Sequence, residues 1–169
     1  SGGTGTQRGF AGGVFGVNYG SRIAELVSQD GSSNTILLAE LRVGINGGDR
    51  RGVWSMGVSG ASLVAGHAIG DSLTPNDAAE KSDDIEDCTA LRSQIGKASV
   101  GMGEMRMGCS FDNAPNNWPN WQAQSRSLHP GGVNVCFGDG STRLIANNIT
   151  NTTWYLLNSR EDGKAIPDF

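Results

Sequence analysis

Two residues of this chain stand where acid–base or metal chemistry would need them: His129 and Asp139, with nine residues between them. An imidazole beside a carboxylate can transfer protons or bind a metal ion. Residues 133–137 lie between the two and predict a strand roughly 16 Å long, which places the side chains at opposite ends of it. We therefore expect no shared catalytic site. Instead, Asp139 shapes a turn, and His129 hydrogen-bonds to neighbouring backbone.

The segment after His129 has the clearest structural pattern. Apolar and polar side chains alternate along residues 133–137, which is typical of a strand with one buried face. Gly138-Asp139-Gly140 then predicts a tight turn, because Asp-Gly between alternating strands is a strong hairpin signal. Residues 141–145 are expected to return antiparallel.

Helical signals are short. Thr150 or Asn151 can cap a helix that runs to residue 159 and buries apolar side chains on the sheet. Residues 21–29 predict one or two helical turns capped by Ser21, or an irregular strand.

The remaining signals favour strands and turns. Residues 30–34 carry a strong turn signal. Glu40 lies inside an apolar run, where a carboxylate must find hydrogen-bond donors or face a sheet edge. Further strands are expected at 13–17, 35–43, 51–56 and 164–166. Together these patterns predict an α+β fold, a single domain over residues 1–169 built mainly on an antiparallel sheet, with a C-terminal hairpin and short helix at 128–169.

Composition supports this class and excludes others. Glycine accounts for 26 of 169 residues, about twice its ordinary share. The net charge of −4 comes without a basic stripe, so no nucleic-acid partner is expected. No apolar run is long enough for a membrane span, and no signal peptide is present. The opening residues read as a loop, typical of a processed or truncated product. Sequence fingerprints of hydrolases, metalloproteases and nucleotide-binding enzymes are missing, so we expect no enzyme and no resident cofactor.

The three cysteines separate into a pair and a single residue. Cys88 and Cys109 lie in loop-like sequence, and a disulfide between them would close a loop of about 20 residues worth ~3 kcal/mol. Such a bridge indicates an oxidising compartment. Cys136 lies in a predicted strand and is interpreted as a small buried residue. The chain has no CxxC motif and only two histidines, which argues against zinc.

Acidic residues gather between positions 71 and 87. Oxygen ligands of this kind suit Ca²⁺, and Asp83, Asp84 and Asp87 are the candidates. The spacing does not match a calcium-binding helix–loop–helix motif. We favour a solvated acidic loop and keep Ca²⁺ as the first candidate for any bound ion.

Residues 57–127 form a loop-rich insertion that we expect to make external contacts. Its best ligand candidates are Trp118 and Trp121 with Asn117 and Asn120, since indole rings stack on sugars and amides bridge hydroxyl groups. Packing of the two tryptophans within the loop is the favoured alternative.

Several motifs resemble one protein family when taken together. Residues 129–141 resemble the H-X9-DG motif of prepilin-type processing-associated proteins and the ending of the DUF1559 family, which is abundant in planctomycetes and their relatives. Residues 30–36 with Glu40 are similar to an upstream segment of that family, and residues 51–54 and 75–77 fit its order. The residues expected to form this framework are Asp30, Gly31, Asn34, Glu40, His129, Gly131, Gly132, Asn134, Asp139 and Gly140.

The resemblance implies a location and an architecture. It implies the C-terminal part of a type IV pilin-like or pseudopilin-like protein, exported to the cell surface or the extracellular space. There the chain would be a non-catalytic structural component of a filament or other assembly, contacting copies of itself or other subunits. Three alternatives remain open: a carbohydrate-binding or adhesive module that takes a glycan, a minor pseudopilin of a type II secretion system, and a hydrolase, for which the sequence offers almost nothing. A prepilin segment encoded upstream would favour the pilus-like assembly.

Overall fold

The computed structural model describes residues 13–16, 19–58, 60–65, 74–78, 82–85, 88–94, 106–110, 122–160, 163–167 and 169. The glycan candidates Trp118, Trp121, Asn117 and Asn120 lie outside these residues, as does Asp87.

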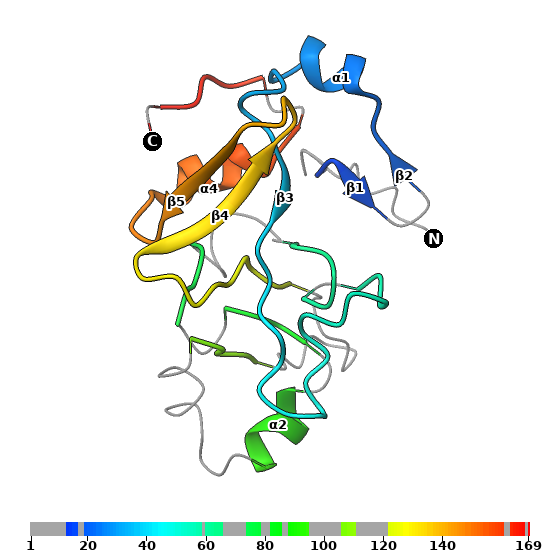
Figure 1. Cartoon of the computed structure of the whole chain (residues 1–169), viewed down its shortest axis with the longest axis vertical. Helices are drawn as coiled ribbons and strands as arrows, with labels where there is room; N and C mark the ends of the chain where they lie inside the picture. Colours follow the sequence, from blue (N-terminus) through cyan, green and yellow to red (C-terminus); the bar gives the residue numbers. More distant parts are fainter. Residues whose placement is uncertain are drawn as a thin grey trace, which may run out of the picture.

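A three-stranded antiparallel sheet dominates one end of the molecule (Figure 1). Its strands are β3 (Ile36–Ala39), β4 (Gly132–Phe137) and β5 (Thr142–Ala146), in the order β3-β4-β5. The helix α4 (Asn151–Leu157) packs on one face. The core between them consists of apolar side chains: Ile36, Val133, Val135, Phe137, Ile145, Trp154 and Leu157. The predicted α+β fold with an antiparallel sheet is therefore confirmed.

The hairpin β4–β5 forms as its sequence predicts. Cys136 pairs with Thr142, and Gly140 adopts a φ of 84°, a conformation that favours glycine. The Asp139 carboxylate accepts a hydrogen bond of 2.8 Å from the Ser141 N–H. Hydrogen bonds from Ser141 lower the pKa of Asp139 and keep it ionised in the turn.

The helix α4 begins at the predicted position. Thr150 is its N-cap, because its hydroxyl oxygen accepts from the Thr153 N–H at 3.1 Å. The helix ends at Leu157, two residues earlier than expected. The edge strand predicted at 164–166 is wrong: these residues are not in a strand, although Ile166 packs against the sheet core.

Two short strands and a helix precede the sheet. The strands β1 (Phe15–Gly16) and β2 (Tyr19–Gly20) pair antiparallel, and α1 (Ile23–Ser28) follows. The N-cap of α1 is Arg22 and not Ser21 as predicted. Glu25 explains the difference, since its carboxylate accepts from the Arg22 N–H at 3.2 Å and closes the first turn.

Two strand predictions need correction. The strand expected at 35–43 is limited to the four residues of β3, with an irregularity after Ile36 and an exposed Leu38. Residues 51–56 form turns and not a strand. Gly52 has a φ of 75° there, and a Cβ on it would lie 2.4 Å from the Arg42 carbonyl oxygen. The polar–apolar alternation of these residues does not reflect a strand with one buried apolar face, because the polar Arg51 is buried while the apolar Trp54 is exposed.

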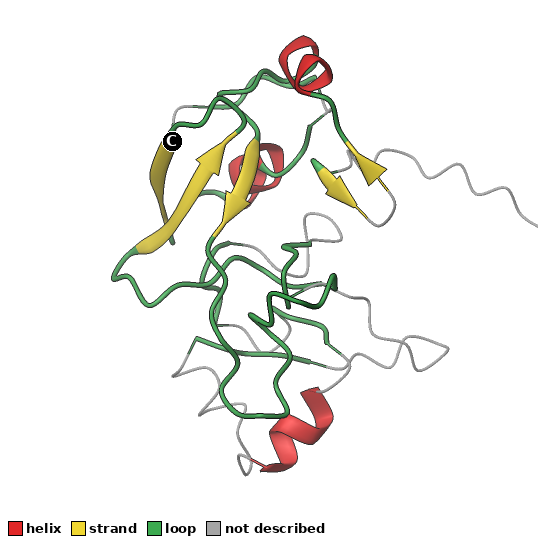
Figure 2. Cartoon of the chain, turned by 45° about the vertical axis from the view of Figure 1, so that its right-hand side comes forward, coloured by secondary structure: helices red, strands yellow, loops and turns green. Residues whose placement is uncertain are grey.

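The described residues below the sheet have little regular structure (Figure 2). We call the described residues between Leu41 and Ser127 the loop lobe. It contains the helix α2 (Cys88–Gln94) and a small apolar core formed by Ile85, Cys88, Leu91 and Cys109. Among the described residues, no helix has the length and apolar character to cross a membrane.

Candidate functional site

Glu40 directly follows β3, and its carboxylate contacts polar groups of His129, which precedes β4, and of Asn134, which lies in β4. Its Oε1 atom lies 3.0 Å from His129 Nε2 and accepts from the Asn134 side-chain amide at 3.0 Å. Its Oε2 atom accepts from the Asn134 backbone N–H at 2.8 Å. We call these three residues the Glu40 clamp. All three were predicted as framework residues, and the structure brings them together.

The main chain of Glu40 extends this junction toward the loop lobe. Its N–H donates to the Asn134 carbonyl at 3.2 Å, while its carbonyl accepts from the Arg126 N–H at 2.9 Å and from the Ser125 hydroxyl at 2.7 Å. Partial burial alone would raise the pKa of Glu40, but the hydrogen bonds from Asn134 and Ser127, together with the charge of His129, outweigh it and lower the pKa. The carboxylate therefore remains an ionised acceptor that joins three segments.

His129 takes a different partner from the one expected. Its ring contacts the Glu40 carboxylate and not neighbouring backbone, so that prediction is wrong. The backbone N–H of His129 donates to the Ser127 hydroxyl at 2.8 Å, which fixes the approach of the ring. No local sequence pattern indicates this pair, because Glu40 and His129 are 89 positions apart.

The two motif segments also touch at their other ends. The Asp139 N–H donates to the Ser32 carbonyl at 3.1 Å, and the Gly138 N–H donates to the Thr35 carbonyl at 3.0 Å. Residues 30–40 and 129–140 are therefore bound to each other at both ends of the β3–β4 pair. The chemistry of these polar residues is hydrogen bonding that fixes the relative position of two strands.

Glycines and local hydrogen bonds shape the ends of this arrangement. Gly31 and Gly131 have φ values of 88° and 89°, which favour glycine. A Cβ on Gly132 would lie 2.3 Å from the Ile145 carbonyl oxygen, so β4 can begin there only without a side chain. The Asn34 side-chain amide donates to the Asp30 carbonyl at 3.3 Å and closes the turn before β3.

A second polar arrangement lies inside the loop lobe. The Asp83 Oδ2 atom accepts from Arg51 Nη1 at 2.9 Å and from Arg126 Nε at 2.7 Å. Arg51 also pairs with Asp49 at 2.7 Å. These four side chains, which we call the arginine cluster, are almost completely buried. Burial alone would raise the pKa of Asp83, but Arg126 and Arg51 lower it.

The arginine cluster also fixes the backbone around it. Arg51 Nη1 donates to the carbonyls of Met107 and Gly108 at 2.9 and 3.2 Å. Arg126 Nη1 donates to the Asp77 and Arg106 carbonyls at 2.8 and 2.6 Å. Two guanidinium groups thus supply the donors that regular secondary structure would otherwise provide.

The predicted disulfide is present. Cys88 and Cys109 are joined with a Cα–Cα distance of 5.8 Å, and both residues are buried. Cys136 is unpaired and only half-buried, on the face of β4 opposite the core, so it is not the buried residue that the sequence suggested.

Comparison of the chain with known protein families agrees with the resemblance that its motifs indicate. A family model described as "Protein of unknown function (DUF1559)" matches residues 2–152. The chain belongs to this family. No curated protein and no solved structure matches it. The matched range contains the Glu40 clamp, the arginine cluster and the disulfide, so all three lie within the DUF1559 domain.

The acidic residues of this DUF1559 domain differ from expectation. Asp83 and Asp84 are buried, so the interpretation as a solvated loop is wrong for both. Two guanidinium groups and the Gln124 N–H occupy the Asp83 oxygens where a calcium ion was considered. Within the described residues no three histidine, cysteine or acidic side chains gather as a metal site. Calcium binding that includes Asp87 stays a prediction.

Sequence reasoning did not single out Asn76. It is buried with a φ of 56°, and its amide donates to the Gly132 carbonyl at 3.2 Å and to the Asn147 side chain at 2.9 Å. Its Oδ1 atom accepts from the Ser127 N–H at 2.7 Å. Asn76 therefore joins the sheet to the loop lobe. Two signals were available: residues 75–77 fit the order of the family motifs, and the turn-like Pro75-Asn76-Asp77 contains an asparagine, which tolerates a positive φ.

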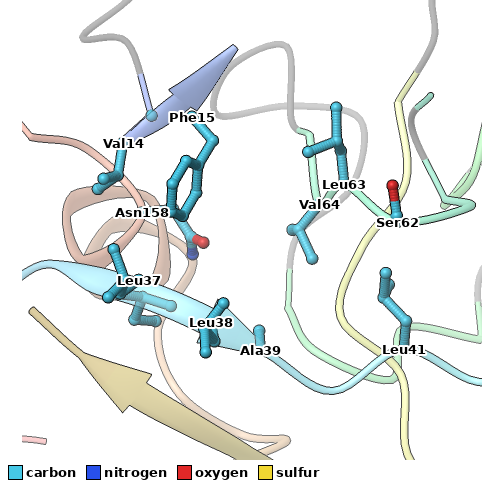
Figure 3. A pocket seen from close by; sticks show the side chains of 12 residues that line it. Val14, Phe15, Leu37, Leu38, Ala39, Leu41, Ser62, Leu63, Val64 and Asn158 are labelled. Atoms are coloured by element: carbon cyan, nitrogen blue, oxygen red, sulfur yellow. The ribbon is translucent and has the colours of Figure 1, made fainter. Parts of the chain in front are cut away.

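A groove of about 140 Å³ lies between β1 and β3 (Figure 3). Side chains from β1, β3 and residues 62–64 face it, and most of them are apolar. Ser62 and Asn158 are its polar lining residues, and neither can act as a general acid or base at neutral pH. The described lining offers shape and apolar contact without acid–base chemistry.

Proposed function

We propose that this DUF1559 domain is a non-catalytic structural domain, exported to the cell surface or the extracellular space, where it is a subunit of a pilus-like or other surface assembly. The observation that carries the proposal is that the polar side chains of the domain bind distant segments of the chain to one another. The Glu40 clamp and the arginine cluster each hold together segments that are far apart in the sequence.

The Glu40 clamp supports a structural role because its carboxylate is already engaged. Both oxygens accept hydrogen bonds from Asn134, and the lowered pKa makes Glu40 a weak base. A general base works best with a pKa near the operating pH and with room to approach a substrate proton. The Glu40 carboxylate has its pKa shifted away from that range and both of its oxygens already engaged.

The disulfide supports export. Structural disulfides persist in oxidising compartments and are rare in the cytosol. The Cys88–Cys109 bridge is buried at the centre of the loop-lobe core, as expected for a permanent structural element.

Localisation and assembly can be tested together in cells that make the protein with its native leader. We expect added protease to cleave it on intact cells, and mild shearing to release it as high-molecular-mass material that electron microscopy can image. A cytosolic protein with free thiols serves as the control for cell integrity. Retention inside the cell contradicts export, and release as monomer alone contradicts assembly.

The absence of catalysis needs a separate test. The purified domain is screened against ester, peptide, glycoside and phosphoester substrates, with and without a chelator, beside the Glu40→Gln and His129→Asn variants. We expect no turnover above background for any of the three. Turnover that Glu40→Gln abolishes while its circular dichroism spectrum stays unchanged contradicts the non-catalytic assignment.

A further inference from the structure

The Cys88–Cys109 bridge occupies an unusual share of the core that surrounds it. Among the described residues, the buried apolar cluster around the bridge consists of Ile85, Leu91 and the two bridged cysteines, so half of its buried members are the disulfide itself. A core this small excludes little water when its two halves separate. The bridge is therefore the covalent centre of the lobe and not an addition to an existing core.

The same bridge fixes the acceptors of the arginine cluster. Cys109 directly follows Gly108, whose carbonyl accepts from Arg51 Nη1 at 3.2 Å and from the Ser82 hydroxyl at 3.2 Å. On the other side, the Cys88 N–H donates to the Ile85 carbonyl, and the Ile85 N–H donates to the Ser110 carbonyl. Segments 82–85, 88–94 and 106–110 are therefore held at one place.

The sheet has no such dependence. Its core contains seven buried apolar side chains and no disulfide, and its strands are paired along their length. Its cysteine, Cys136, is unpaired. Opening of the Cys88–Cys109 bridge removes no contact within this core.

We infer that only the loop lobe depends on the bridge for its fold. When the purified protein is reduced with a dithiol, two electrons and two protons pass to the bridge, so that its S–S bond breaks into two thiols and the reductant closes to a cyclic disulfide. Segment 106–110 then separates from segments 82–85 and 88–94, and the guanidinium groups of Arg51 and Arg126 lose their carbonyl acceptors at Arg106, Met107 and Gly108 and reach water. The sheet stays folded, and the loop lobe completes its fold only after oxidation.

Hydrogen exchange read by mass spectrometry can test this dependence of the loop lobe on the bridge at neutral pH. The reference is the Cys136→Ser protein with the bridge intact, and the variant adds Cys88→Ser and Cys109→Ser. We expect the amides of Asp84, Ile85 and Ser110, which are hydrogen-bonded in the loop lobe, to exchange about 100-fold faster in the variant. Amides of β4 and β5 should stay within about twofold of the reference.

Two results would overturn the inference. Unchanged protection in the loop lobe would show that the lobe folds without the bridge. Equal loss of protection in both regions would show that the bridge holds the whole domain. Should the triple variant fail to fold during production, the folded Cys136→Ser protein is reduced in place with a small dithiol, and exchange is followed before and after reoxidation. Reoxidation should restore protection in the loop lobe.

Discussion

In the sheet, the buried side chains of β4 are all apolar, whereas the loop lobe buries the side chains of Arg51 and Arg126 beside Asp49 and Asp83. Both regions exclude water, but they do so by different means. Apolar packing tolerates substitutions that keep shape and volume, with a loss usually below about 1.5 kcal/mol. A buried ion cluster depends on the charge and geometry of each member. One domain therefore contains a tolerant region and a strict one.

Removal of the charge on Asp83 is the strongest way to separate the two regions. Asp83→Asn keeps the side-chain shape but leaves two buried guanidinium groups facing a neutral amide. We expect the free energy of unfolding to fall by about 3–5 kcal/mol, because an unpaired buried charge is costly. Urea denaturation followed by circular dichroism measures it. A loss below about 1 kcal/mol would show that the cluster contributes little to stability.

Conservative substitutions sharpen the comparison. Arg126→Lys keeps the charge but loses the planar group that reaches Asp83, Ser82 and the carbonyls of Asp77, Arg106 and Gly108. A loss of about 2–3 kcal/mol is therefore expected. Its counterpart in the sheet core, Ile145→Val, should cost only about 0.5–1.5 kcal/mol. Thermal and urea unfolding of both variants provide the measurement. A greater loss for Ile145→Val would reverse the assignment of strict and tolerant regions.

The Glu40 clamp lies where the two regions meet, and its contribution should depend on pH. Folding lowers the pKa of Glu40 below its ordinary value of 4.5, so the stabilisation is complete above that pH and is lost as the pH falls through the folded pKa. We expect Glu40→Gln to be less stable than the parent at pH 5.5, and the difference to shrink as the pH falls below 4.5. A difference between the two proteins that stays constant over this range would disprove the linkage.

The smallest effect is expected in the hairpin turn. Asp139 is fully exposed, and its carboxylate accepts the Ser141 N–H, which an asparagine oxygen can also do. Asp139→Asn should leave the midpoint of thermal unfolding unchanged within error. A clear loss of stability in this variant would indicate that the charge of Asp139 has a role beyond the turn.

The sequence predicted those parts whose causes are local. Alternation along β4, the Asp-Gly turn and the Thr150 cap each act within a few residues, and the hairpin and α4 formed as expected. The disulfide was predictable because Cys88 and Cys109 were the only cysteines in loop-like sequence.

The arginine cluster could not be predicted in the same way. Arg51 and Arg126 reach Asp83 across 32 and 43 positions, so no periodic pattern reports their contact. Residues 51–56 even gave a misleading strand signal, because the burial of Arg51 is set by distant partners. Asp83 was predicted to be solvated because its partners Arg51 and Arg126 are likewise distant in the sequence. Glu40 was recognised as a carboxylate in need of donors, but its donors could be identified only in three dimensions.

The paired attachment of residues 30–40 to residues 129–140 restricts how this domain can change length. The Ser32–Asp139 contact fixes one end and the Glu40–Asn134 contact the other. The lengths of β3 and β4 between these two contacts therefore depend on each other. Deletion of one residue from β4 would turn Asn134 to the opposite face of the sheet and remove its amide from Glu40. A compensating deletion in β3 would be needed to restore the register. Insertions are accommodated only outside these two fixed points, as in the connections of the loop lobe.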